Sequence, residues 1–152
     1  MTDETTETDE RFMRRAIELA REGAERGNTP FGAVLVRDGA EVAADHNTVA
    51  ADDDLAAHPE LKLARWAWRE LTADERAETT MYASTMPCMM CSAGIAVAGL
   101  ERVVYGVNGE TAGKYGPDRG VPTTDYLREA TDTRVDGPVL PEAAEDVHRD
   151  HW

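Results

Sequence analysis

Lysine is nearly absent from this 152-residue chain, and its scarcity belongs to a strong charge imbalance. Thirty acidic residues stand against 16 cations, of which only Lys62 and Lys114 are lysines, so the net charge is −14. A chain this negative repels phosphate backbones at ordinary salt, so nucleic acid is not an expected partner. Because salt screens charge repulsion, such a surface favours a halophilic source, the alternative being an ordinary acidic cytoplasmic protein.

Long apolar runs and signals for export are also missing. No apolar run approaches the roughly 18 residues that a membrane span requires. The first ten residues lack the basic and apolar regions of a secretory signal. We therefore expect a cytoplasmic protein that makes no membrane contact.

Cysteine is scarce as well, since Cys88 and Cys91 are the only two, spaced as C-x-x-C. Nothing in the sequence indicates an oxidising compartment, which argues against a structural disulfide. A thioredoxin-like redox pair and a metal site both match this spacing, and the spacing alone does not decide between them.

The length predicts one domain with a substantial core. Residues 1–10 are acidic and almost free of apolar side chains, which predicts a disordered tail before a domain over residues 11–152. Periodic apolar residues predict helices over residues 11–26, 59–71, 88–98, 124–130 and 141–149. Short apolar runs predict strands over residues 31–36, 41–45, 79–84, 102–107 and 133–139, the first two as a hairpin. The glycine-rich stretch 106–120 predicts a flexible connection, and the alternation predicts an α/β fold with parallel pairing wherever a helix separates two strands.

Two short motifs supply metal ligands: His58-Pro59-Glu60 and Pro87-Cys88-Met89-Met90-Cys91. Zinc prefers imidazole and thiolate ligands, and a catalytic zinc keeps three protein ligands with one position for water. The two cysteines lie three apart at the start of a predicted helix, so both thiols face one side. No other cysteine exists to close the site, so the motifs predict one open, catalytic zinc ion per chain.

Glu60 stands two residues from a predicted ligand, close enough to share the pocket without binding the metal. A carboxylate there can take a proton from the attacking water, pass it to a ring nitrogen and then help ammonia to leave. This set of groups is suited to hydrolytic deamination of an amidine carbon.

The motifs together resemble the cytidine and deoxycytidylate deaminase superfamily, whose H-x-E and P-C-x-x-C signature they match. The likeness extends to Phe31-Gly32-Ala33-Val34, similar to the first strand of guanine deaminases, and to the strands before and after the cysteines. It implies a three-layer α/β/α cytidine deaminase-like fold with a five-stranded mixed sheet flanked by helices, assembled as a homodimer. The middle residue of H-x-E is usually alanine or glycine in this family, so Pro59 is a departure.

The resemblance also implies four substrate-binding residues, each of which has a structural alternative. Asn47 matches an asparagine that contacts the base in free-base deaminases, or is a turn residue. Phe31 walls an apolar pocket, or packs in the core. Asp150 and Trp152 match a tail that covers the pocket in fungal cytosine deaminases, or belong to a frayed terminus.

Three functions follow from these residues. The first is zinc-dependent deamination of a free nucleobase or related small heterocycle, with cytosine or guanine as first candidates. The second is a tRNA adenosine deaminase, which needs a cationic face that this chain lacks. The third is a zinc-stabilised fold without catalysis, which a fourth protein ligand would favour.

Overall fold

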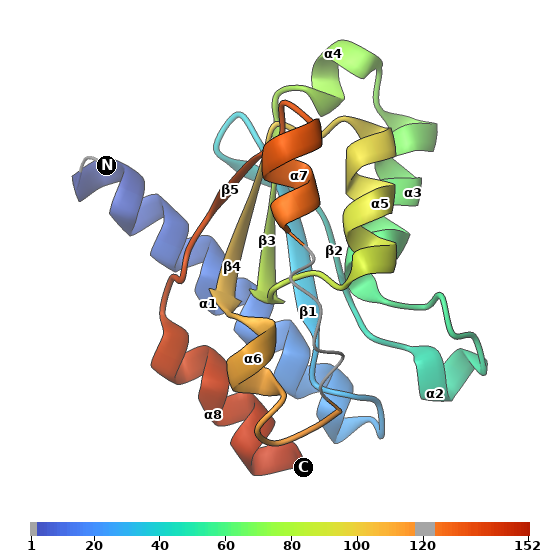
Figure 1. Ribbon diagram of the computed structural model, residues 1–152, viewed down its shortest axis with the longest axis vertical. Helices are drawn as coiled ribbons and strands as arrows, with labels where there is room; N and C mark the ends of the chain where they lie inside the picture. The colour runs from blue at the N-terminus through green and yellow to red at the C-terminus, as the bar shows by residue number, and fades with distance from the viewer. Residues whose placement is uncertain (1–2, 118–123) are drawn as a thin grey trace.

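A five-stranded sheet in the order β2-β1-β3-β4-β5 runs through the computed structural model, which describes residues 3–117 and 124–152 (Figure 1). Helices cover both faces of the sheet, so the predicted three-layer α/β/α architecture is confirmed. The strands are β1 (Gly32–Arg37), β2 (Ala40–His46), β3 (Thr79–Thr85), β4 (Arg102–Val107) and β5 (Arg134–Asp136).

Strand direction follows from the hairpin at the start of the sheet. β1 pairs antiparallel with β2 on one side and with β3 on the other, whereas β3, β4 and β5 are parallel. The rule that helix-separated strands pair in parallel therefore holds for the last three strands but not for β1 and β3. The hairpin reverses the chain, so β3 is parallel to β2 yet inserts beside β1. The carboxyl ends of β3 and β4 consequently lie at one edge of the sheet.

The helices form two layers with separate apolar cores. They are α1 (Asp3–Glu25), α2 (Val49–Asp52), α3 (Pro59–Glu70), α4 (Ala73–Arg76), α5 (Met89–Ala98), α6 (Gly109–Ala112), α7 (Asp125–Ala130) and α8 (Pro141–His151). Helices α1 and α8 pack on one face of the sheet, with Met13, Val34 and Val104 in their core. Helices α3, α5 and α7 pack on the other, with Leu63, Ile95 and Leu127 in theirs.

The N-terminal segment differs from its prediction, because α1 begins at Asp3 and not after residue 10. Asp9 is only 1% exposed and accepts two hydrogen bonds from the Arg102 guanidinium, at 2.9 and 3.0 Å. The Tyr82 hydroxyl donates to the same carboxylate at 2.7 Å. This corrects the predicted disorder of residues 3–10: acidic composition alone does not reveal that one aspartate has a buried arginine on β4 as its partner.

The predicted connection over residues 106–120 contains a single helical turn, α6, and another single turn, α2, precedes the first metal motif; both are too short to show a helical period. Residues 118–120 of the predicted glycine-rich connection lie outside the described residues. Among the helices described, none combines the length and the apolar character needed to cross a membrane.

Candidate metal centre and active site

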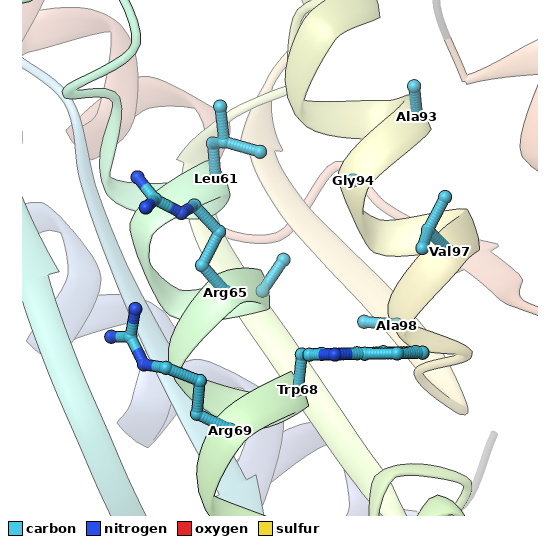
Figure 2. A pocket seen from close by; sticks show the side chains of 9 residues that line it. Leu61, Arg65, Trp68, Arg69, Ala93, Gly94, Val97 and Ala98 are labelled. Atoms are coloured by element: carbon cyan, nitrogen blue, oxygen red, sulfur yellow. The ribbon is translucent and has the colours of Figure 1, made fainter.

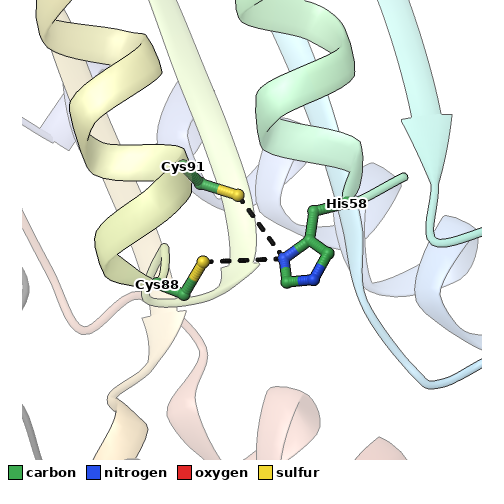
Figure 3. A group of neighbouring side chains, drawn as sticks. All are labelled: His58, Cys88 and Cys91. Carbon is green, nitrogen blue, oxygen red and sulfur yellow. Dashed lines mark hydrogen bonds between the residues drawn. The ribbon is translucent and has the colours of Figure 1, made fainter. Parts of the chain in front are cut away.

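The three predicted metal ligands come from the starts of two neighbouring helices. His58 is the residue that precedes α3, with Pro59 in the first helical position, where its missing N–H costs nothing. Cys88 precedes α5 in the same way, and Cys91 lies in the first turn. Because α3 and α5 pack side by side, the imidazole ring faces both sulfurs (Figure 3).

The spacing of these ligand atoms fits a zinc ion. Nδ1 of His58 lies 3.6 Å from Sγ of Cys88 and 3.5 Å from Sγ of Cys91. All three ligand atoms lie within 4.8 Å of one another. Tetrahedral zinc, with bonds of about 2.0 Å to nitrogen and about 2.3 Å to sulfur, separates such atoms by about 3.6 Å. The residues therefore form one face of a zinc tetrahedron, and among the described residues no other histidine, cysteine or carboxylate joins the cluster.

The electrostatics of the two sulfurs favour a cation between them. A hydrogen bond with Cys91, together with one from His58, lowers the pKa of Cys88 to about 4. The same Cys88 contact, together with burial, raises the pKa of Cys91. The thiolate is therefore favoured at Cys88, and a metal ion held by both sulfurs would bind them as thiolates. His58, Cys88 and Cys91 are accordingly positioned to hold one zinc ion.

Glu60 lies beside the cluster and is 5% exposed. Its Oε1 is the one buried side-chain oxygen or nitrogen in the described part of the chain that has no hydrogen-bond partner. Burial raises the pKa of Glu60 to about 7; the nearby Cys88 charge adds to this, while a bond from its own backbone amide opposes it. A buried carboxylate with a spare acceptor next to an open metal position is equipped to exchange a proton with bound water.

Asn47 and Phe31 are brought together, and the residue after Asn47 is bonded to the residue before His58, since the Thr48 N–H donates to the Ala57 carbonyl at 3.0 Å. Asn47 is 2% exposed; its backbone N–H donates to the Phe31 carbonyl at 3.0 Å, and its Oδ1 accepts from the Val49 N–H at 2.9 Å. The Phe31 ring is half-buried, and its centroid lies 5.3 Å from that of the His148 ring. Asn47 is thus a turn residue, as one of its two sequence interpretations predicted. The bonds of this turn use its backbone N–H and its side-chain oxygen but not its side-chain nitrogen.

The two predicted tail residues have different surroundings. The Asp150 carboxylate is 62% exposed and pairs with Arg21 of α1 at 3.3 Å. Trp152 packs against Gly116, where an added Cβ would collide with the indole ring. The indole N–H donates to Nδ1 of His148 at 3.2 Å.

His148 is the residue of this region that the motifs do not reveal. It is 1% exposed, and its Nε2 lies 2.7 Å from Oγ1 of Thr85, at the end of β3. The available signal is its spacing on α8, since Ala144, Val147 and His148 share the buried face at steps of three and four residues. That spacing predicts burial but not a hydrogen-bonding role.

Comparison with known proteins supports the assignment. The family described as the cytidine and deoxycytidylate deaminase zinc-binding region matches residues 6–107. The guanine deaminase of Bacillus subtilis is 38% identical over 110 residues, covering 72% of this chain and 70% of that protein. The tRNA-specific adenosine deaminase of Agrobacterium fabrum is 35% identical over 102 residues, covering 67% of each.

One further relative spans nearly the whole chain. A "Probable cytosine deaminase" of Schizosaccharomyces pombe is 27% identical over 156 residues, covering 98% of this chain and 95% of its own length. Among solved structures, the guanine deaminase from Nitrosomonas europaea superposes with a TM-score of 0.82 at 24% identity, covering 93% of this chain and 83% of that one. At 24% identity, this structural similarity supports the fold alone.

Proposed function

Because the chain belongs to the cytidine and deoxycytidylate deaminase zinc-binding family, we propose that it deaminates a free nucleobase or related small heterocycle, with cytosine or guanine as first candidates. Hydrolytic deamination is the chemistry of this family. The observation that carries the proposal is the buried, unpartnered Oε1 of Glu60 beside three residues positioned for one metal ion. A structural zinc site has no use for such a group.

The residues divide the reaction between them. His58, Cys88 and Cys91 hold the zinc ion, which when bound lowers the pKa of water and so supplies a nucleophile near neutral pH. Glu60 takes the proton that this water loses and delivers it to the ring nitrogen of the base. Once the oxygen has added to the amidine carbon, Glu60 takes the remaining proton of that oxygen and transfers it to the amino group, and the C–N bond breaks with the amine as the leaving group. One water is consumed and one ammonia is released.

The charge of the chain supports a small substrate over RNA. Helix α8, which lies over the sheet near the carboxyl end of β4, carries Glu142, Glu145, Asp146 and Asp150 against a single arginine, Arg149. With a net charge of −14, this surface repels a polyphosphate chain. The second candidate, a tRNA adenosine deaminase, rests on the 35% identity to such an enzyme. RNA binding that persists across a salt series would favour it.

We further propose a homodimer formed through the outer face of α3 and α5. A groove of about 410 Å³ lies between these helices (Figure 2). Its lining is apolar apart from two arginines and consists of Leu61, Ala64, Arg65, Trp68, Arg69, Ala93, Gly94, Val97 and Ala98. Trp68 is 56% and Val97 is 72% exposed, and exposed apolar patches mark interaction sites.

A second copy of the chain has the chemistry to cover this groove. Among the described residues neither Arg65 nor Arg69 pairs with a carboxylate, and a copy with a net charge of −14 offers many. Light scattering at matched salt tests the proposal: wild type is expected as a dimer, and Val97→Glu as a monomer. A monomeric wild type would contradict it.

The substrate proposal is tested by ammonia release from cytosine, guanine, adenine, their nucleosides and aminotriazines, each at low and high salt. We expect turnover of a free base in preference to its nucleoside. If the source is halophilic, the rate of ammonia release rises with salt, because salt screens the repulsion between the acidic side chains of the surface. We also propose a cytoplasmic location, since Cys88 and Cys91 form no disulfide and a reducing compartment keeps cysteines reduced.

A further inference from the structure

His148 connects three segments that the chain keeps far apart in sequence. Trp152 donates its indole N–H to Nδ1 of His148 at 3.2 Å, so Nδ1 must be an acceptor. The ring proton therefore resides on Nε2, which donates to Oγ1 of Thr85 at 2.7 Å. The hydrogen bonds thus select one neutral tautomer and run in one direction, from Trp152 through His148 to Thr85.

The surroundings of the ring support this neutral form. His148 is 1% exposed, and burial, with a smaller contribution from His151, lowers the pKa of His148 to about 4. A protonated ring would direct a second N–H at the indole N–H, which has no acceptor to offer. The Phe31 ring lies at a 70° angle to the His148 ring, which is an edge-on contact suited to aromatic partners.

The partners of His148 lead directly into the proposed active site. Thr85 ends β3 three residues before Cys88. Phe31 is joined to Asn47 by the bond between its carbonyl and the Asn47 N–H. Helix α8 packs against β4, and Figure 1 places the C-terminus near α6, at the end of the sheet where β3 and β4 finish. Two of the four predicted substrate residues, Phe31 and Trp152, therefore contact His148 directly.

We propose that His148 is a positioning residue for the base: as its Nε2–H tautomer, it fixes the Phe31 and Trp152 side chains relative to the end of β3. This role rests on the proposed function, because it concerns binding of the same base. His148 touches no reacting atom, so its loss weakens base binding and leaves the chemical step intact.

Two substitutions separate the two hydrogen bonds of the ring. Glutamine places an amide N–H near the former Nε2 and keeps the bond to Thr85, whereas asparagine places an oxygen near the former Nδ1 and keeps the bond from Trp152. Both variants are measured in the zinc-loaded protein, with guanine and cytosine as probes. We expect KM to rise about five- to tenfold in each, because each variant loses one buried hydrogen bond. We expect kcat within about twofold of wild type and zinc content unchanged. The matched control is Glu142→Gln, an exposed change on the same helix.

A double-mutant cycle tests the direction of the chain. Trp152→Phe removes the indole donor and keeps an aromatic ring. Combined with His148→Gln, which has already lost the bond from Trp152, the Trp152→Phe change should leave KM where it is. Combined with His148→Asn, which keeps that bond, it should raise KM again. Thr85→Val, which removes the hydroxyl at nearly constant volume, should show the opposite pattern. Equal additivity in all four combinations would overturn the proposal.

A measurement independent of turnover reports the tautomer. Nitrogen-15 spectra of the histidine rings at pH 7 should show the His148 proton on Nε2 in wild type. A proton on Nδ1, or a doubly protonated ring, would overturn the inference even in an active enzyme. Unchanged KM in both His148 variants would also overturn it. A wild type that releases no ammonia from any base contradicts the proposed function itself, an outcome separate from either of these.

Discussion

Two buried carboxylates in this chain have opposite surroundings. Asp9, 1% exposed on α1, accepts two hydrogen bonds from Arg102 and one from Tyr82. Glu60, 5% exposed at the start of α3, leaves Oε1 without any partner beside the metal ligands. Both carboxylates lose hydration on folding, but only Asp9 regains full hydrogen bonding from the protein.

The difference separates a group that holds the fold together from a group that, as we propose, serves the reaction. A buried ion pair that is fully hydrogen-bonded fixes the position of its elements, here α1 against β3 and β4. Removing one partner strongly destabilises the fold, because the other charge is left buried. An unpartnered buried carboxylate weakens the fold and persists where chemistry needs it. The following predictions test this contrast, from the largest expected effect to the smallest.

The largest effect is expected from removal of a metal ligand. Cys91→Ala should lose its bound zinc and its ammonia release together, because the described residues offer no substitute ligand. Metal analysis and an ammonia assay on the same sample check this. Wild type stripped by a chelator should recover when zinc is restored, whereas the variant should not. A variant that keeps zinc and activity would show that the ligand set is wrong.

Asp9→Asn should destabilise the fold by about 3 to 5 kcal/mol, because it leaves the buried Arg102 charge with Asp136 as its remaining partner. Urea unfolding followed by circular dichroism measures the loss. The rate per folded, zinc-loaded molecule should not change, since Asp9 is far from the base. Glu10→Gln, a half-buried neighbour whose surface pair is with Arg14, should change stability by less than about 0.5 kcal/mol. An equally small effect of Asp9→Asn would contradict the structural role.

The buried His148 predicts a loss of stability in acid. Its folded pKa, about 4, lies below the ordinary value of 6.5, so the unfolded chain binds the proton first as the pH falls. The stabilisation is therefore complete above pH 6.5 and decreases towards pH 4, by about 3 kcal/mol in all. Urea midpoints measured from pH 8 to pH 4 should fall more steeply in wild type than in His148→Gln. Parallel curves would contradict this assignment.

Glu60→Gln should produce the smallest change in stability, and its sign is opposite to that of Asp9→Asn. Replacing a buried carboxylate by a neutral amide removes an uncompensated charge, so the chelator-treated variant should gain about 1 to 2 kcal/mol at pH 8. Urea unfolding of both metal-free proteins gives the comparison. A variant that is less stable than wild type would indicate a partner for Glu60 that stabilises the fold.

Most of the fold could be predicted because its signals are local. The strand predicted over residues 102–107 coincides with β4, and the other strand ends differ by a few residues. The four-residue helices α2, α4 and α6 could not be predicted, because one turn shows no period. The helical start at Asp3 was missed for a different reason. Asp9 is stabilised by Arg102, far along the chain, and the composition of residues 1–10 does not indicate this contact.

The site divides in the same way. The grouping of His58, Cys88 and Cys91 could be predicted because two short motifs with fixed spacing specify zinc ligands. The role of Glu60 as a proton carrier stays a prediction. His148 could not, since its partner Thr85 lies 63 residues away and a lone histidine on an apolar helix face is usually packing. Asp150 was placed at the substrate by resemblance, but its carboxylate pairs with Arg21, 129 residues distant. An ion pair between surface residues so far apart in the sequence cannot be predicted, because no spacing or periodicity connects the two residues.

The contrast between Asp9 and Glu60 rests most directly on zinc content and ammonia release measured in the same preparations of wild type and Glu60→Gln. The proposed mechanism predicts about one zinc ion per chain in both proteins, because Glu60 is not a ligand. It predicts that kcat falls about 10²- to 10⁴-fold in the variant, the size of a lost general acid and base. Zinc-loaded Glu60→Gln that releases ammonia at the wild-type rate would contradict the mechanism.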